Sequence, residues 1–391
     1  MEPERLSHPQ VSESRWRVPL ADITVDDELA GPVLDTVRSG WWSMGPRVGE
    51  FEQAFADFCR AEHAVAVANG TAALHLALLA VGCGPGDEVI VPSLNFVAAA
   101  NTIAHTGADP VFCDIVGPDD LNLDPADVEA AVTPRTKAVV VLHYGGYPCA
   151  MDQIDEIAER HGLAVVEDAA HAPGASLRGR MCGTLGRVGC FSFFSNKNLP
   201  VGEGGMIVTG DEELAARLRL LRSHGMTTLT WDRHRGHASG YDVVAAGFNY
   251  RLDEVRAVLG LVQLRRLPEE NAARARISAR YREALDGEQG LAMPFGRDGG
   301  DRISSHHLAV VLLPDGLDRG EVRGALEVRG IQTSVHYPPI HTFSQYRSAQ
   351  GQRELPRTDA IADRLLTLPL YGRLSGEQVE SVIDALRDAL P

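Results

Sequence analysis

From residue 64 onward, short apolar runs alternate with helical segments, and this alternation constrains the fold more than any other feature of the sequence. The runs cover 64–68, 88–92, 110–115, 138–142 and 163–167, with helical patterns between them at 72–81, 96–105, 125–132 and 151–161. Continuously apolar strands joined by helical crossovers form a mainly parallel α/β sheet covered by helices on both faces. Ligands bind such sheets at the carboxyl ends of the strands, so the residues just after each strand are candidate site residues.

The pattern differs on either side of this region. Two helices are expected at about 26–38 and 48–60, an amphipathic helix at 211–223, and a long polar, glycine-punctuated segment at 225–250. A long helical region at about 253–287 then leads to a mixed series: strand 307–313, helix 319–329, strand 331–336, helix 358–365, strand 366–369 and helix 376–388. We therefore expect an N-terminal arm over 1–20, a large domain over 21–265, and a small α+β C-terminal domain over 266–391.

Composition excludes several classes of function. The formal net charge is −16 over 391 residues and no run of basic residues offsets it, which argues against a nucleic-acid partner. No apolar run reaches the length of a membrane span, and the N-terminus lacks the apolar core of a signal peptide. The six cysteines are scattered without a CxxC pair, as in a cytoplasmic protein with reduced thiols. We expect no metal site.

Lys197 stands out because the chain has only two lysines, the other being Lys137. It follows an apolar run and precedes the glycine-rich residues 202–205, where the backbone can approach a neighbour closely. A primary amine can lose its proton and condense with a carbonyl, whereas a guanidinium cannot. A surface lysine in a turn is the alternative, and this segment alone leaves both open.

Two segments suit a phosphate group. In Asn69-Gly70-Thr71-Ala72, Gly70 permits a sharp turn after a strand and Thr71 is placed at the cap of the next helix, whose free N–H groups attract anions. Ser192 is the one hydroxyl in the run 189–194 and could reach the same phosphate. The alternatives are an ordinary helix cap and a core serine.

Three further residues fit a planar, charged ring. Glu167 and Asp168 end a buried strand, and because side chains alternate only one of them can face the ligand. A carboxylate there can pair with a protonated ring nitrogen, although a helix cap is an alternative. His171 could bond a phenolic oxygen or a backbone carbonyl. Phe96 could stack on the ring or belong to the core.

Together, a lysine, a strand-end carboxylate, a helix-end phosphate site and a stacking aromatic are what a pyridoxal 5′-phosphate (PLP) site needs. In such a site the lysine amine bonds the cofactor carbonyl, and the carboxylate keeps the ring nitrogen protonated so that the ring accepts electrons. Burial near a cationic ring lowers the pKa of the lysine, which suits it to carry protons once it is released.

The chain also resembles the DegT/DnrJ/EryC1/StrS aminotransferases, PLP-dependent enzymes of fold type I that aminate keto-sugars and keto-cyclitols. The resemblance runs from about residue 18 to the C-terminus and rests on six ordered stretches: NGTAAL (69–74), GPGDEVIVPSLNFVAAAN (84–101), VVEDAAHAPGA (165–175), GCFSFFSNKNLPVGEGGMIVT (189–209), GFNYRLDE (247–254) and GIQTSVHYPPIH (330–341). It implies a large domain with a mainly parallel seven-stranded sheet between helices and a small α+β domain.

The resemblance also implies roles for single residues. Lys197 matches the lysine that bonds the cofactor, Asp168 the partner of the ring nitrogen, and His171 a position near the ring oxygen. Phe96 matches the stacking aromatic, and the phosphate contacts match Gly70, Thr71, Ala72 and Ser192. Asn249 matches an asparagine that reaches the cofactor of the neighbouring subunit, which implies a homodimer with shared active sites. Asn95 stands where threonine is more usual, and Ser195-Asn196 replaces other pairs before the lysine.

The implied reaction transfers an amino group from glutamate or glutamine to a nucleotide-linked keto-deoxysugar, for an amino-sugar of a secondary metabolite such as an antibiotic or of a polysaccharide. A keto-cyclitol such as scyllo-inosose remains an alternative substrate. A PLP-bound regulator without turnover and a PLP-dependent lyase or dehydratase are alternatives of other classes; relatives with histidine at the lysine position eliminate a hydroxyl, and Lys197 argues against that reaction. Candidate substrate contacts are Trp231, Arg233, His234, Arg235 and His237 in the long polar segment, with His336 and Tyr337 as further candidates.

Overall fold

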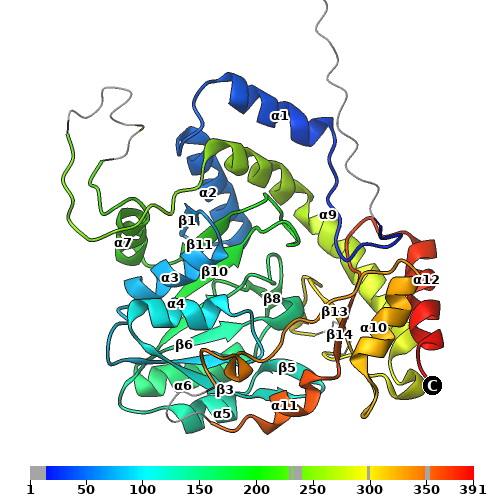
Figure 1. Ribbon diagram of the computed structural model, residues 1–391. Coiled ribbons are helices and arrows are strands. Elements are labelled where there is room, and N and C mark those ends of the chain that lie inside the picture. Colours follow the sequence, from blue (N-terminus) through cyan, green and yellow to red (C-terminus); the bar gives the residue numbers. More distant parts are fainter. Residues whose placement is uncertain (1–14, 229–230, 232–239, 297–299, 348–352) are drawn as a thin grey trace, which may run out of the picture.

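A computed structural model describes residues 15–228, 231, 240–296, 300–347 and 353–391. Its centre is a seven-stranded sheet in the order β1-β11-β10-β7-β6-β2-β3 (Figure 1). These strands are β1 His63–Val67, β2 Glu88–Pro92, β3 Asp109–Cys113, β6 Thr136–Leu142, β7 Ala164–Asp168, β10 Val188–Ser192 and β11 Gly205–Thr209. Only β11 runs antiparallel to its neighbours, so the predicted mainly parallel α/β sheet is confirmed.

Helices cover both faces of this sheet, as continuously apolar strands require. One face carries α3 Gly70–Ala80, α4 Ala98–Thr106 and α7 Glu212–Arg222. The other carries α2 Pro46–Cys59, α5 Pro125–Ala131, α6 Met151–His161 and the first half of α9 Glu254–Leu285. Helix α1 Asp27–Arg38 packs on α9.

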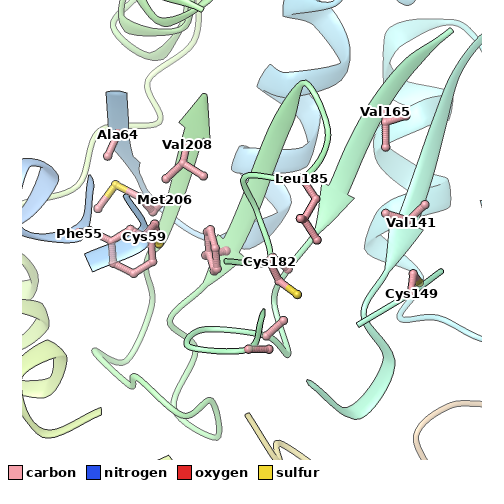
Figure 2. Packing of buried hydrophobic residues seen from close by; sticks show 14 of the residues in the cluster. Phe55, Cys59, Ala64, Val141, Cys149, Val165, Cys182, Leu185, Met206 and Val208 are labelled. Carbon is pink, nitrogen blue, oxygen red and sulfur yellow. The ribbon is translucent and has the colours of Figure 1, made fainter. Parts of the chain in front are cut away.

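Neighbouring residues along a strand serve opposite faces of the sheet. Cys190 of β10 packs with the α3 side, whereas Phe191 packs with Phe55 of α2. Figure 2 shows part of the second of these cores, in which Met206 and Val208 of β11 lie close to Phe55 and Ala64. Because both faces are sealed by apolar side chains, polar chemistry is confined to the ends of the strands.

A smaller unit at the C-terminal end is built on β13 Ala309–Leu312 and β14 Leu365–Leu368. It includes α10 Arg319–Val328 and α12 Gly376–Asp388, and α9 reaches it from the large sheet (Figure 1). Helix α11 Pro356–Ala362 lies instead against strand β4 Ile115–Gly117. The core of the smaller unit includes Tyr281, Val311 and Val382 together with Val18 from the start of the described chain. The domain boundary at residue 265 stays a prediction, since α9 continues through it, and residues 1–14 of the expected arm lie outside the described residues.

Short elements complete the fold. They are the hairpin β4 Ile115–Gly117 and β5 Asp120–Leu123, the small sheet of β8 Ser176–Leu177, β9 Arg180–Met181 and β12 Arg302–Ile303, and single 3-10 turns at Tyr144–Gly146, Glu288–Gly290 and Ile340–Thr342. Among the described helices, none combines the length and apolar content needed to span a bilayer.

The strand predicted over 331–336 is wrong. Ile331 forms an isolated bridge to Val18, and Ser334 forms another to Thr367. Because these two partners belong to different segments, the backbone never builds a continuous ladder with either one. The alternating sequence that predicted a strand reflects contacts on two sides of an extended segment.

The end of β7 is fixed by the buried carboxylate of Glu167, which is 0% exposed. It accepts backbone hydrogen bonds from Gly183 (2.6 Å), Leu185 (2.7 Å) and Gly186 (2.6 Å). It also accepts one from His143 Nε2 at 2.8 Å, while His143 Nδ1 accepts from the Cys149 amide and therefore carries no proton. Four donors thus satisfy a buried anion and tie β7 to the segment before β10.

Replacing Glu167 with glutamine should destabilise the protein strongly. The new amide group would turn an N–H donor towards backbone donors, so at least one buried group would lose its partner at a cost of about 3 kcal/mol. Urea unfolding of the variant measures this loss against Glu62→Gln, an exposed glutamate, which should remain near wild type. Equal stability of the two variants would contradict the proposed role of Glu167.

Candidate active site

A cavity of about 400 Å³ lies at the edge of the sheet where the parallel strands end. The segments after β1, β2, β7 and β10 reach it, together with residues from the C-terminal unit. It is lined by Asn69, Gly70, Thr71, Leu74, Asn95, Phe96, Ala98, Leu142, Asp168, Ala170, His171, Cys190, Phe191, Ser192, Phe194, Asn196, Lys197, Glu203, His336 and Tyr337. Residues up to 268 positions apart in the chain therefore share one site, since Asn69 and Tyr337 both line it.

Lys197 follows β10 in a tight turn in which its backbone N–H donates to the Phe194 carbonyl at 2.9 Å. Its side chain reaches the cavity, and burial lowers the pKa of its amine to about 8, against the opposing effect of Asp168. About a tenth of such an amine is neutral at pH 7, compared with about one part in three thousand at an ordinary lysine pKa. The expected nucleophile is therefore available near neutral pH.

Asp168 ends β7 and is 5% exposed. Burial raises the pKa of its carboxyl, while the Ala170 amide (3.2 Å), the Lys197 amine and the Asn95 amide (3.4 Å) oppose this effect. Its oxygens hold one backbone bond and one long side-chain bond, which leaves it able to accept from a further donor in the cavity. A cationic ring nitrogen would be such a donor.

Helix α3 begins at Gly70, directly against Ser192. Asn69, not Thr71, is its N-cap: the Asn69 side chain accepts from the Ala72 amide at 2.8 Å, so the prediction that Thr71 caps the helix is wrong. Asn69 caps the helix because its carboxamide oxygen accepts directly from the third helical amide. The Ala72 N–H is thereby occupied, and the helix end offers an anion the Gly70 and Thr71 N–H groups.

A side chain at position 70 would close this phosphate-sized space. A Cβ on Gly70 would lie 2.7 Å from Cβ and 3.1 Å from Oγ of Ser192. Glycine at position 70 therefore lets the start of α3, which follows β1, and the Ser192 hydroxyl at the end of β10 approach the same part of the cavity. The core-serine alternative is wrong, because Ser192 lines the cavity.

His171 and Tyr337 form one wall. His171 Nδ1 accepts from the Gly145 amide at 3.3 Å, which leaves Nε2 to donate to the Tyr337 hydroxyl at 2.8 Å. Burial lowers the pKa of His171 well below its usual value, so the ring is neutral. Phe96 lies opposite, 5.9 Å from the Tyr337 ring and 56% exposed; the alternative that Phe96 belongs to the core is wrong.

The remaining candidates are more scattered. His336 lines the cavity and contacts the Thr367 hydroxyl at 3.0 Å, with its pKa lowered to about 4 by burial. Asn249 is exposed, outside the cavity, next to Ser223. Trp231 also lies elsewhere, with its ring 4.7 Å from that of Trp41. Arg233, His234, Arg235 and His237 lie outside the described residues.

Two further residues have a place at this site: Asn196, which the sequence marks only as a departure from the family pattern, and His307, which was not identified from the sequence. Asn196 lines the cavity, and its Oδ1 is buried without a hydrogen-bond partner in the described chain. His307 approaches Lys197, with 3.5 Å between His307 Nε2 and Lys197 Nζ. The only sequence signal for it is a histidine pair ahead of an apolar strand.

The cavity fits PLP. The helix end with Ser192 matches a phosphate, Asp168 a protonated ring nitrogen, and Phe96 one face of the ring. The Lys197 amine lies in the same cavity as all three. The unpartnered Asn196 oxygen adds an acceptor that a bound polar group can satisfy.

Comparisons with known proteins identify similar chains. Residues 24–387 match the model of the DegT/DnrJ/EryC1/StrS aminotransferase family. The spore coat polysaccharide biosynthesis protein SpsC of Bacillus subtilis is 46% identical over 91% of this chain and 92% of its own. GDP-perosamine synthase of Caulobacter vibrioides is 41% identical over 96% of this chain and 98% of its own.

Solved structures show the same fold. The aminotransferase TlmJ from Streptoalloteichus hindustanus superimposes with a TM-score of 0.88 at 39% identity, over 95% of this chain and 98% of its own. The Spr1654 protein of Streptococcus pneumoniae, at 28% identity and with the same coverage, has been solved in PLP and PMP forms with TM-scores of 0.88 and 0.89.

Proposed function

Because this chain belongs to the DegT/DnrJ/EryC1/StrS aminotransferase family, whose members depend on PLP, we propose that it makes an amino-sugar. It moves the amino group of glutamate or glutamine to the keto group of a nucleotide-linked keto-deoxysugar. The observation that supports this most is the convergence of Lys197, Asp168 and the Gly70–Ser192 cradle in one cavity.

The residues divide the chemistry between them. When bound, the cofactor supplies a carbonyl that takes up the amino group and a ring that withdraws electrons from the donor carbon. Gly70, Thr71 and Ser192 would hold the phosphate, and Asp168 would keep the ring nitrogen protonated. Lys197, with its lowered pKa, would move the proton that leaves the donor carbon.

Two observations support a sugar nucleotide as the acceptor. GDP-perosamine synthase, 41% identical, is named for a nucleotide-linked amino-sugar, and SpsC, 46% identical, for a polysaccharide pathway. Besides Phe96, which is assigned to the cofactor ring, the rim of the cavity carries the aromatic ring of Phe194, at 45% exposure. Such rings pack against the apolar face of a hexose or a base. A secondary metabolite or a polysaccharide is the expected destination of the product.

The working unit is a homodimer in which Asn249 serves the partner's cofactor. Asn249 is exposed and lies outside its own cavity, so within one chain it has no contact with the site. The exposed apolar side chains of Tyr241, Val243 and Val244 lie on the same segment, at 54–56% exposure. An apolar surface of this kind favours burial against a second copy.

Lys197→Ala should abolish both transamination and covalent attachment of the cofactor, because alanine offers no amine. Glutamate is added to the PLP-loaded protein, and 2-oxoglutarate release is measured; borohydride reduction and peptide mass spectrometry locate the cofactor on the chain. Lys137→Ala is the matched control, since Lys137 is the other lysine and is exposed. If Lys197→Ala still released 2-oxoglutarate, the lysine assignment would be wrong. If the wild type took an amino group from neither glutamate nor glutamine, the alternative of a PLP-bound regulator without turnover would be favoured instead.

Mixing two inactive variants tests the shared site. After subunit exchange, a dimer of Lys197→Ala with Asn249→Ala has one site with both native residues and one with neither. Random pairing of equal amounts should restore about a quarter of wild-type 2-oxoglutarate release. Activity that stays at the level of the separate variants would place Asn249 in its own chain's site or outside catalysis.

A substrate panel separates the sugar from the cyclitol. GDP- and dTDP-linked 3-keto and 4-keto hexoses and scyllo-inosose are each incubated with glutamate and PLP-loaded protein, and amines are detected by mass. We expect an amine from at least one nucleotide-linked sugar and none from the cyclitol. An amine from scyllo-inosose alone would reverse the substrate assignment while leaving the reaction type intact.

A further inference from the structure

His307 contacts the reactive lysine from outside the cavity. His307 Nε2 lies 3.5 Å from Lys197 Nζ, and the histidine is 5% exposed and absent from the cavity lining. It stands just ahead of β13 in the C-terminal unit, whereas Lys197 follows β10 in the large sheet. The contact therefore joins the two parts of the fold at the amine itself.

Two asparagine side chains determine which ring nitrogen of His307 faces Lys197. Asn271 Nδ2 donates to the Pro173 carbonyl at 2.9 Å, so Asn271 presents its oxygen to Asn198. Asn198 Nδ2 donates to that oxygen at 2.8 Å and to the Ser305 carbonyl at 2.7 Å. Carbonyl groups only accept, so both amides have a single orientation that satisfies every bond.

The orientation of Asn198 then determines the tautomer of His307. The Asn198 oxygen lies 2.9 Å from His307 Nδ1, which must carry the proton to donate to it. His307 Nε2 is left with its lone pair, directed at Lys197. Burial and the nearby positive charge of Lys197 hold the pKa of His307 well below its usual value, so the ring keeps this neutral form.

We propose that His307 is a positioning residue for Lys197: its Nε2 accepts a hydrogen bond from the amine and so turns the nitrogen lone pair towards the cavity. The proposal rests on the proposed role of Lys197 as the residue that bonds the cofactor. Asn198, adjacent to Lys197 in sequence, and Asn271 of α9 set the acceptor in place.

Other charged and titratable groups around the amine act in different directions. Asp168 of β7 favours the ammonium form of Lys197. His171 after β7 and His336 before the 3-10 turn Ile340–Thr342 are neutral, with pKa values lowered by burial. Glu203 and the Tyr337 hydroxyl also line the cavity. None of these groups has a hydrogen-bond contact with Lys197 Nζ in the described chain, whereas His307 does.

Because the chain has only two lysines, the reactivity of the Lys197 amine can be measured by labelling, without catalysis. In PLP-free protein, an amine-reactive reagent is applied across pH 6–11 and the modification of Lys197 and Lys137 is read by peptide mass spectrometry. His307→Asn retains a donor for Asn198 but is too short to reach Lys197. His307→Gln reaches Lys197 with its amide oxygen. His306→Asn is the matched control, because His306 contacts Tyr147 instead and has a φ of 48°, which asparagine tolerates.

Removing His307 Nε2 takes a neutral acceptor from Lys197. This destabilises the ammonium form of Lys197 more than its neutral amine form, because a hydrogen bond from a charged donor is stronger. We expect the midpoint of Lys197 modification in His307→Asn to fall about one pH unit below the wild-type value. His307→Gln and His306→Asn should stay close to wild type, and Lys137 should not change in any variant. An unshifted midpoint in His307→Asn, or an equal shift in His306→Asn, would overturn the proposal.

A measurement on the wild type covers the case in which His307→Asn does not fold. Long-range ¹H–¹⁵N correlation of the imidazole nitrogens in PLP-free protein should show Nδ1 protonated and Nε2 unprotonated in His307. The reverse tautomer would overturn the proposal. Neither readout needs turnover, so failure here leaves the aminotransferase function standing, and loss of turnover in Lys197→Ala says nothing against His307.

Discussion

The buried carboxylate of Glu167 is the constraint on which the site depends. Its four hydrogen bonds fix β7 against the segment before β10 on the α2 side of the sheet. Because successive side chains of a strand point to opposite faces, anchoring Glu167 on that side turns Asp168 to the α3 side, where the cavity lies. Two adjacent acids thus have separate tasks: one holds the strand, and the other remains free to accept from a ligand. An uncompensated charge at Glu167 would be costly to bury, so the register of β7 is strongly determined.

Close backbone approach is the second requirement. Strand β11 enters the sheet between β1 and β10 and runs against them, which brings its first residue beside the start of α3. A Cβ on Gly205 would lie 2.5 Å from the Asn69 carbonyl oxygen, and one on Gly70 would lie 2.7 Å from Ser192 Cβ. Glycine at both positions lets the helix end, the Ser192 hydroxyl and the lysine turn meet at one cavity. Of the glycine-rich run after Lys197, Gly205 is therefore explained by close packing against the start of α3.

Much of this could be predicted from the sequence because its causes are local. The parallel strands and their crossover helices follow from apolar runs of fixed length, and Lys197 and Asp168 follow from their positions at strand ends. The failures come from tertiary contacts. Residues 331–336 have a strand-like sequence but pair with two different segments. The sequence predicts Thr71 as the cap of α3, yet Asn69, two positions earlier, accepts from the Ala72 amide instead. His307 was missed because its partner, Lys197, is 110 residues away, and no local pattern reports such a contact.

The charges around the cavity limit which anions its described lining residues can hold. Lys197 is the only lysine or arginine among its described lining residues, and Asp168 and Glu203 carry the opposite charge. The histidines on this wall are neutral, since burial lowers the pKa values of His171 and His336. A site of this composition does not attract a dicarboxylate donor or a sugar diphosphate by itself, because planar anions are best held by arginine. Binding of either anion would therefore need cations besides those of the described lining residues.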